Sequence, residues 1–233
     1  TVSSTSGSAN QTIIVTAVSE NPSTSTRAAI ITISGAGITR TVNVTQAGAT
    51  DLSVNPSSVN LAYTSGSAGA FNIASANITW NISGMPAWIS LSATSGSSSQ
   101  SITVTTMEVN PSTTPRSATL TITDGTLSST VTVTQAGAPS LTVSTSNIAL
   151  PFTSSSGGFD VASENTTWNI TDNASWIDVI PISGSTNQAI TVTANSDNPT
   201  TVERVGTITV TGSGITRTVT VTQAGAPSLE VNP

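Results

Sequence analysis

Residues 130–138 have the sequence TVTVTQAGA, in which apolar and polar side chains alternate before a short Gly-Ala segment. Val131 and Val133 fall on one face of the segment and three Thr side chains on the other. This period of two is typical of a β-strand with one buried face. The same pattern occurs at residues 41–45 and 218–222. Since Thr is β-branched, it favours strand geometry and keeps the exposed face polar without adding charge.

The string VTQAGA occurs three times and marks an internal repeat. Its Gln residues, Gln46, Gln135 and Gln223, lie 89 and 88 positions apart. Three landmarks precede each Gln at constant spacing: a Gly, an Asn-Pro pair and an Arg. These are Gly7, Gly96 and Gly184; Asn21-Pro22, Asn110-Pro111 and Asn198-Pro199; and Arg27, Arg116 and Arg204. Such self-similarity predicts a tandem-repeat protein.

The landmarks divide the chain into a partial repeat (1–49), two full repeats (50–138 and 139–226) and the first strand of a further repeat (227–233). Residues 1–49 match only the second half of a repeat, and half a sandwich cannot close its own core. We therefore expect either a piece of a longer array or an open half that another chain completes. No secretory leader precedes Thr1, which predicts a mature protein or an excised fragment.

Each full repeat contains seven or eight short apolar-alternating segments separated by Gly, Pro, Asn and Ser clusters. This spacing predicts an all-β fold of tandem, immunoglobulin-like antiparallel β-sandwiches. No segment has a helical period. The one-residue difference in repeat length falls between Tyr63 and Phe71, where we expect a hairpin loop, because loops absorb length changes and paired strands do not.

Composition excludes several classes of function. The chain has 233 residues, no His, no Cys and a net charge of -6, and all five of its basic residues are Arg. These counts exclude disulfides, a Cys/His zinc site, a Ser-His-Asp triad and a thiol nucleophile. They also argue against nucleic-acid binding, which needs clustered cations. No apolar run reaches the length of a membrane span. We expect a non-enzyme with no cofactor and no metal.

Carboxylates gather only in the last full repeat. The four residues are Asp160, Glu164, Asp172 and Asp178, and the second repeat has Asn72, Ala76, Gly84 and Ser90 at these positions. A pair of carboxylates is what a glycosidase requires, and Asp172, Asn173 and Asp178 could supply calcium ligands. No motif of either kind accompanies them, so both remain minor alternatives.

Residues 165–226 resemble the BACON domain (Bacteroidetes-Associated Carbohydrate-binding Often N-terminal). The shared features are a pair of Trp before a Ser-Gly turn, an Asn before an Arg-led strand, and a closing VTVTQ strand. The resemblance extends over both full repeats and the partial one. It implies an immunoglobulin-like sandwich on secreted or surface proteins of Bacteroidota or of their phages. Such domains often accompany glycoside hydrolases or peptidases.

Four Trp are the candidate glycan contacts, since sugar-binding modules present aromatic faces. Two of them, Trp80 and Trp168, alternate in phase with Ile residues. The other two, Trp88 and Trp176, are each followed by Ile, which places them inside strands. We therefore favour core packing over sugar stacking for all four. For the three recurring Arg we expect a structural role at a strand start, contacting backbone carbonyls. The recurring Gln is expected to close the last strand or to bond to the linker.

The pattern as a whole favours a structural or adhesive segment of an extracellular or bacterial cell-surface protein, such as a stalk, fibre or filament subunit. Neighbouring repeats or identical chains would be its partners. Linkers of about four residues predict restricted bending between repeats. Residues 227–233 could pair head-to-tail with the partial repeat of another chain. The alternatives are an array of weak glycan-binding modules and a non-catalytic spacer of a secreted glycoside hydrolase or peptidase.

Overall fold

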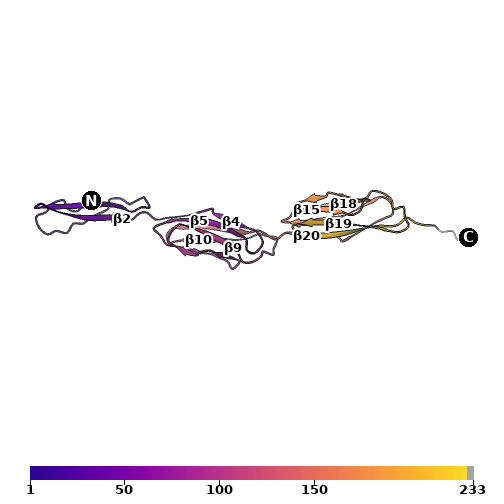
Figure 1. The fold of residues 1–233 in the computed structure, drawn as a ribbon, viewed down its shortest axis with the longest axis horizontal. Coiled ribbons are helices and arrows are strands. Elements are labelled where there is room, and N and C mark those ends of the chain that lie inside the picture. The colour runs from indigo at the N-terminus through magenta and orange to yellow at the C-terminus, as the bar shows by residue number, and fades with distance from the viewer. Residues whose placement is uncertain (230–233) are drawn as a thin grey trace. The chain divides into compact units, whose positions relative to one another are not determined.

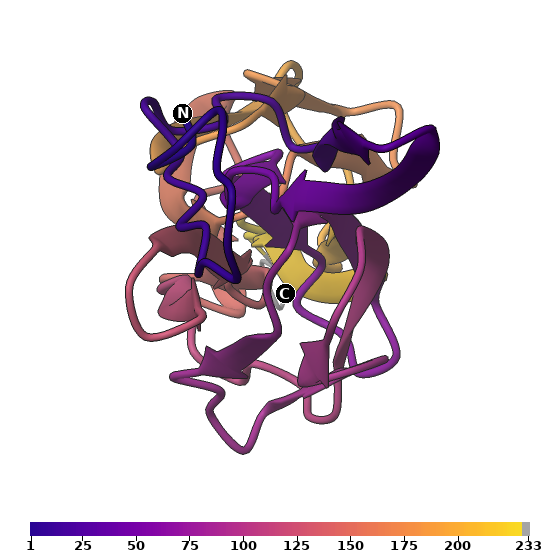
Figure 2. The same cartoon turned by 90° about the vertical axis from the view of Figure 1, so that its left-hand side faces the viewer.

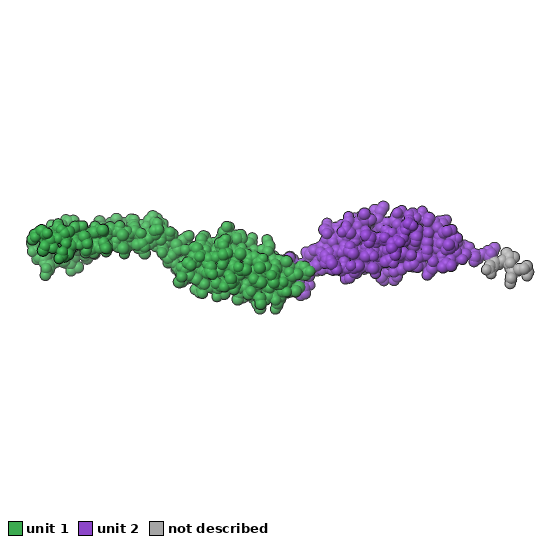
Figure 3. All heavy atoms as spheres, in the orientation of Figure 1, with its two compact units in different colours: residues 1–109, 117–135 green, residues 110–116, 136–233 purple. Residues whose placement is uncertain are grey.

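The computed structural model describes residues 1–229, and all of the regular structure in that range is β-strand. No helix long and apolar enough to cross a membrane occurs in this range. The chain forms two compact units, coloured separately in Figure 3. The first consists of residues 1–109 and 117–135, and the second consists of residues 110–116 and those from 136 onward. Each unit is described by itself below.

The repeat at 50–138 folds as two facing sheets, whose strands are labelled in part in Figure 1. One sheet has the strand order β4-β11-β10-β6-β8, and the other has the order β3-β5-β9-β7. The strands are β3 (Asp51–Asn55), β4 (Ser58–Leu61), β5 (Ala68–Ala76), β6 (Trp80–Ser83), β7 (Ile89–Leu91), β8 (Ser95–Gly96), β9 (Gln100–Thr106), β10 (Arg116–Thr123) and β11 (Ser128–Gln135).

The repeat at 139–226 has the same two sheets in the same order, β13-β20-β19-β15-β17 and β12-β14-β18-β16. Two stretches of different sequence therefore adopt one topology, which confirms the predicted all-β, tandem sandwich fold. The strands are β12 (Ser140–Val143), β13 (Asn147–Leu150), β14 (Ser155–Glu164), β15 (Trp168–Asp172), β16 (Ile177–Ile180), β17 (Ser183–Gly184), β18 (Gln188–Ala194), β19 (Arg204–Gly212) and β20 (Ile215–Gln223).

The alternating strands bury the faces that the sequence pattern predicts. Val131 and Val133 of β11 are fully buried between the sheets, and so are Val219 and Val221 of β20. The intervening Thr side chains lie at or near the surface. Each full repeat has one contiguous apolar cluster built from both sheets, so each contains its own core.

Two details of strand pairing differ from the sequence-based expectation. First, β11 pairs in parallel with β4, with Val133 opposite Val59, and β20 pairs in parallel with β13. The sandwiches are therefore antiparallel except at this one edge. Second, β4 and β5 belong to different sheets, so the segment between Tyr63 and Phe71 crosses from one sheet to the other. The expected hairpin at that point was wrong: residues 62–67 form a loop between the sheets, and β5 begins at Ala68.

Residues 1–49 form a smaller structure within the first unit. Strands β1 (Arg27–Gly35) and β2 (Ile38–Gln46) make a two-stranded antiparallel sheet, drawn in indigo in Figure 2. Ala36 and Gly37 join them with positive φ angles of 50° and 79°, as a tight hairpin turn with right-handed twist requires. A single antiparallel bridge links Val2 to Val15.

Each Gly-Ala linker is hydrogen-bonded to the Asn-Pro loop that precedes it. The backbone N–H of Ala138 donates to the Ser112 carbonyl at 2.8 Å, and that of Ala226 donates to the Thr200 carbonyl at 2.7 Å. In the second unit, the amide of Asn165 donates to the carbonyls of Thr113 (2.7 Å) and Ala138 (3.0 Å). The linker at Ala138 is therefore bonded both to the loop that precedes it and to Asn165, which follows it in the chain. The expected strand at 227–233 is absent from 227–229, and its remainder lies outside the described residues.

Candidate functional site

Trp80 and Trp168 lie in the cores of the two full repeats. Both side chains are fully buried, and each indole N–H donates to a backbone carbonyl, that of Ser98 (3.1 Å) or Thr186 (3.2 Å). Because buried indoles need such a partner, these bonds complete their packing. Neither ring presents a face to solvent on which a sugar could stack.

Trp88 and Trp176 occupy a different position. Each lies in the turn one residue before a strand, β7 or β16, and not inside the strand as the sequence suggested. Both are partly buried and pack against the edge of the adjacent core. The guanidinium carbon of Arg204 lies 4.5 Å from the centroid of the Trp176 ring, which is cation–π geometry. One face of this ring is therefore covered by the protein itself.

The recurring Arg and Gln form a hydrogen-bonded network in the partial repeat and in the last repeat. In the last repeat, Nε of Arg204 donates to Oε1 of Gln223 at 2.7 Å, and its Nη2 donates to the Ser196 carbonyl at 2.8 Å. The fully buried Gln223 amide donates to the carbonyls of Phe152 (3.0 Å) and Ser196 (3.2 Å). This network joins the end of the last strand to two loops.

The same contacts recur at the other copies. Nε of Arg27 donates to Gln46 at 2.7 Å, and the Gln135 amide donates to the carbonyls of Tyr63 and Glu108 at 3.0 and 2.9 Å. The Arg residues begin β1, β10 and β19, as predicted. The bonds of Arg27 and Arg204 to loop carbonyls agree with the structural role that the sequence suggested.

The carboxylates of the last repeat are not gathered into one cluster. Within residues 1–229 there is no cluster of three or more His, Cys, Asp or Glu side chains. Of the candidate calcium ligands, Asp172 accepts the Ala174 N–H at 3.1 Å, and Asn173 accepts the Thr207 N–H at 2.7 Å. These oxygens therefore shape the loop around β15.

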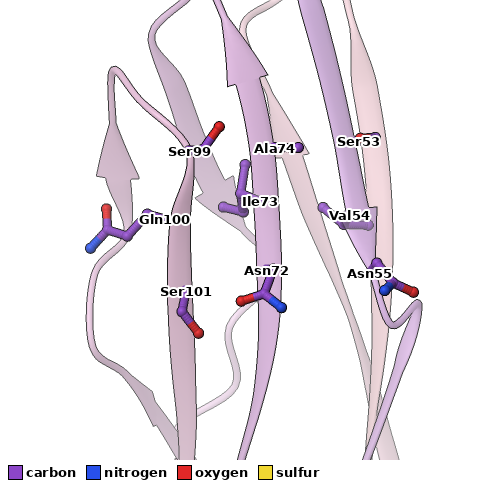
Figure 4. A pocket seen from close by; sticks show the side chains of 9 residues that line it. All are labelled: Ser53, Val54, Asn55, Asn72, Ile73, Ala74, Ser99, Gln100 and Ser101. Carbon is purple, nitrogen blue, oxygen red and sulfur yellow. The ribbon is translucent and has the colours of Figure 1, made fainter.

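A shallow hollow of about 400 Å³ lies on the sheet that contains β3, β5 and β9 (Figure 4), and its lining includes both apolar and polar side chains. The strand register places Asn55 opposite Asn72, and Asn72 opposite Ser101, so three polar side chains form a row across adjacent strands. Amide and hydroxyl groups in a row offer hydrogen-bond donors and acceptors. No aromatic or charged side chain lines the hollow.

Sequence reasoning missed this row. Its members come from three separate strands, and only the observed register brings them side by side. The available signal was the position of each residue at an outward-facing place in its own alternating segment. That signal does not identify which strands are neighbours.

Comparison with protein families gives the chain an assignment. The BACON profile, whose description proposes an N-terminal binding domain, matches residues 1–47 and 79–136. A second profile, the viral BACON domain, matches residues 141–226. The chain belongs to the BACON domain family. The matched segments include the partial repeat, the repeat at 139–226 and the part of the repeat at 50–138 from residue 79 onward.

The chain resembles several solved structures, and the first of those described below supports the immunoglobulin-like fold. The extracellular cadherin domains 1–5 of protocadherin gamma B2 match 87% of this chain and 46% of their own at 10% identity, with a TM-score of 0.50. A GH5 xyloglucanase of Bacteroides ovatus matches 40% of the chain at 22% identity, with a TM-score of 0.35. The D00-D0 fragment of intimin matches 73% of this chain and 96% of its own at 12% identity, with a TM-score of 0.43.

At these identities the likeness concerns the fold alone. The chain spans only a fifth of the xyloglucanase chain that it matches. Among curated proteins, no sequence matches the BACON chain.

Proposed function

We propose that this BACON chain is a non-catalytic structural and adhesive segment of an extracellular protein on a bacterial cell surface, serving as a stalk, fibre or filament subunit. The supporting observation is the fastening of each Gly-Ala linker to the preceding loop. Ala49, Ala138 and Ala226 make the same backbone hydrogen bond at 2.7–2.8 Å. Because each linker is held to the repeat that precedes it, fewer linker residues are free to move, which suits a load-carrying array.

The surface of the repeats is consistent with this role. Thr and Ser cover the outer faces, and charged residues make up only 7% of the chain. A surface that is polar but weakly charged has little long-range electrostatic interaction with ions or nucleic acids. The proposed partners are accordingly neighbouring repeats or identical chains.

Electron microscopy of the purified chain at low and high concentration tests this proposal. Dispersed short particles with separate beads would indicate a stalk segment, and regular fibres with a fixed repeat would indicate a filament subunit. Irregular collapsed particles at every concentration would contradict a structural array.

Fibre formation would proceed by head-to-tail strand exchange, with residues 227–233 donated to the partial repeat of the next chain. The counterparts of this segment, β3 and β12, pack against β11 and β20 in the full repeats, and β2 is the matching strand of the partial repeat. Deletion of 227–233 is expected to abolish fibres. Unchanged fibres after the deletion would end the exchange proposal.

Glycan binding is the second candidate function, supported by the polar row at Asn55, Asn72 and Ser101. Weak sites repeated along one chain gain affinity through multivalency. Four partly buried aromatic residues offer further surface: Tyr63, Trp88, Phe152 and Trp176. On a glycan array, Asn72→Ala is expected to weaken any binding seen, whereas Asn60→Ala, on the opposite sheet, is the matched control. The third alternative is a spacer beside a secreted hydrolase or peptidase. It predicts that neither the native chain nor its variants bind glycans on the array.

A further inference from the structure

Residues 1–49 already have the geometry of the second half of a full repeat. Arg27 pairs with Gln46 across β1 and β2, as Arg204 pairs with Gln223 across β19 and β20. The Val2–Val15 bridge likewise matches a pair in the last full repeat, Val179 with Val192. The partial repeat is therefore formed in the native register before anything is added to it.

The inner face of the partial repeat is exposed, whereas the corresponding face of each full repeat is buried between its two sheets. Ile33 and Val42 are 54% and 47% exposed, but their counterparts in the second repeat, Ile122 and Val131, are completely buried. Ile13 and Val15 are also exposed, whereas the equivalent Ile102 and Val104 are buried. A contiguous apolar face of this kind marks an interaction surface.

Both outer edges of the β1–β2 sheet are also open within the described residues. In the second repeat, β10 is the counterpart of β1 and pairs with β6, placing Ile122 opposite Ile82. There, β11 is the counterpart of β2 and pairs in parallel with β4. Open edges next to an apolar face can accept added strands.

A hollow of about 500 Å³ lies at the centre of this face, between the segment that contains Gly7 and strand β1. Ile13, Ile31 and Ile33 contribute its apolar lining. By repeat spacing, Gly7 corresponds to Gly96 and Gly184. An added Cβ at Gly96 would collide with the indole ring of Trp80, and one at Gly184 with that of Trp168. At Gly7 the nearest atom is only the tip of the Gln11 side chain. The hollow is thus the counterpart of the space that a Trp fills in each full repeat.

We propose that this hollow is a receptor for a tryptophan-bearing β-strand, and that its occupant is the first half of a BACON repeat. The strand has the pattern Trp-Asn-Ile followed by Ser or Thr, as in β6 and β15. Its indole packs on Gly7 and donates its N–H to the Ala9 carbonyl, the counterpart of the Ser98 acceptor of Trp80. The Ile of the strand pairs with Ile33.

The chemistry of the hollow favours this occupant over the alternatives. The lining is uncharged and combines Ile and Val side chains with Ser, Thr and Gln groups, which suits a neutral strand better than an ionic ligand. A second copy of residues 1–49 could offer an edge but no Trp, since that segment contains none. This inference deepens the proposed structural role and rests on it, because it specifies how an open repeat is completed.

The first test is a fusion that places residues 50–89 directly before Thr1 of the native chain, since Thr1 corresponds to Ser90. Amide hydrogen exchange is then measured by mass spectrometry. We expect exchange in β1 and β2 to slow by roughly 100-fold, because a closed sandwich replaces an exposed sheet. A fusion carrying Trp80→Ala in the added copy is the control and is expected to give little protection.

The second test supplies the same segment in trans to the native chain. A polypeptide of residues 50–89 carries Trp88→Phe, so that 5-fluorotryptophan reports only on Trp80 by fluorine NMR. Binding is expected to shift and broaden this resonance. Gly7→Ala in the chain should abolish the shift, because the new methyl group occupies the indole site. Gly35→Ala is the matched control, since a Cβ there meets no atom within 4 Å and no positive φ is required.

Two results would overturn the inference: unchanged exchange in the fused chain, or a fluorine shift that survives Gly7→Ala. Failure here is distinguishable from failure of the structural role. Particle shape and fibre formation in electron microscopy test that role in the unmodified chain and do not depend on the added segment.

Discussion

The indole ring of Trp80 occupies the space in which a Cβ of Gly96 would lie. The two residues are opposite each other in the β6–β8 pair, and the ring lies against the bare Cα of the glycine. Gly96→Ala should therefore force the ring or the strand to move in a closed core. Overpacking of this kind costs about 1–3 kcal/mol, and we expect this loss of unfolding free energy in urea denaturation of the chain.

Gly7→Ala provides the matched control for that substitution. The same position in the partial repeat has open space in place of the ring, apart from the flexible end of Gln11. We expect its effect on stability to be within about 0.5 kcal/mol. Equal losses for the two variants would show that backbone conformation, and not contact with the indole, sets the requirement for glycine.

The Arg204–Gln223 pair is expected to hold the closing strand of the last repeat to its loops. Arg204→Met keeps an apolar stem near Trp176 but removes the bonds to Gln223 and to the Ser196 carbonyl. Hydrogen bonds from charged donors contribute about 1.5–3 kcal/mol each. Since Arg204 is partly solvated, we expect a loss of roughly 2 kcal/mol, measured by thermal unfolding.

Arg217→Met serves as the reference for Arg204→Met, because among residues 1–229 the one hydrogen-bond partner of the Arg217 side chain is the carbonyl of adjacent Thr216. It should leave the melting temperature nearly unchanged. A comparable loss in both variants would point to the general removal of positive charge.

Asn165 combines a left-handed backbone (φ 54°) with two amide hydrogen bonds to the carbonyls of Thr113 and Ala138. Asn165→Gly retains the backbone conformation and loses only the bonds, whereas Asn165→Ala loses both. We expect hydrogen exchange near Ala138 to accelerate in both variants, and stability to fall further in the Ala variant by about 1 kcal/mol. Unchanged exchange in both would mean that the linker does not depend on this side chain.

Asp124 gives the β10–β11 turn a dependence on pH. Its carboxylate accepts the backbone N–H groups of Leu127 (2.6 Å) and Thr126 (2.8 Å), and these bonds hold its pKa below the ordinary value of 3.8. Because the folded pKa is the lower one, the stabilisation is present above pH 3.8 and is lost as the pH falls through the folded pKa. NMR titration should find this low pKa, and Asp124→Asn should remove the corresponding pH dependence of the turn.

The apolar alternation was sufficient to predict the sheets and their buried faces. Val131 and Val133 are buried as expected, because a half-buried strand imposes a period of two on its own residues. The core position of Trp80 follows from the same local pattern. The recurring Arg was also predictable as a strand start, since its spacing from the closing Gln is constant.

Pairing between distant strands was not predictable in this way. Nothing local in the segment at Val59 shows that it lies beside Val133 in a parallel pair, because the alternation within each strand is the same for either direction. The position of Trp88 was missed for a related reason. An Ile follows it, as in a strand, but the strand begins only at that Ile. The polar row and the open hollow likewise arise from packing between segments.

The parallel pair of β4 and β11 also determines how a repeat responds to tension. Strand β4 lies near the start of the repeat and β11 at its end, so a pull on the two ends of the repeat drags the strands in opposite directions along their own axes. The ladder from Ser58–Leu61 to Thr132–Gln135 is then loaded in shear, and its bonds share the load and yield together. A BACON repeat of this design would resist stretching more than a hairpin that opens one bond at a time.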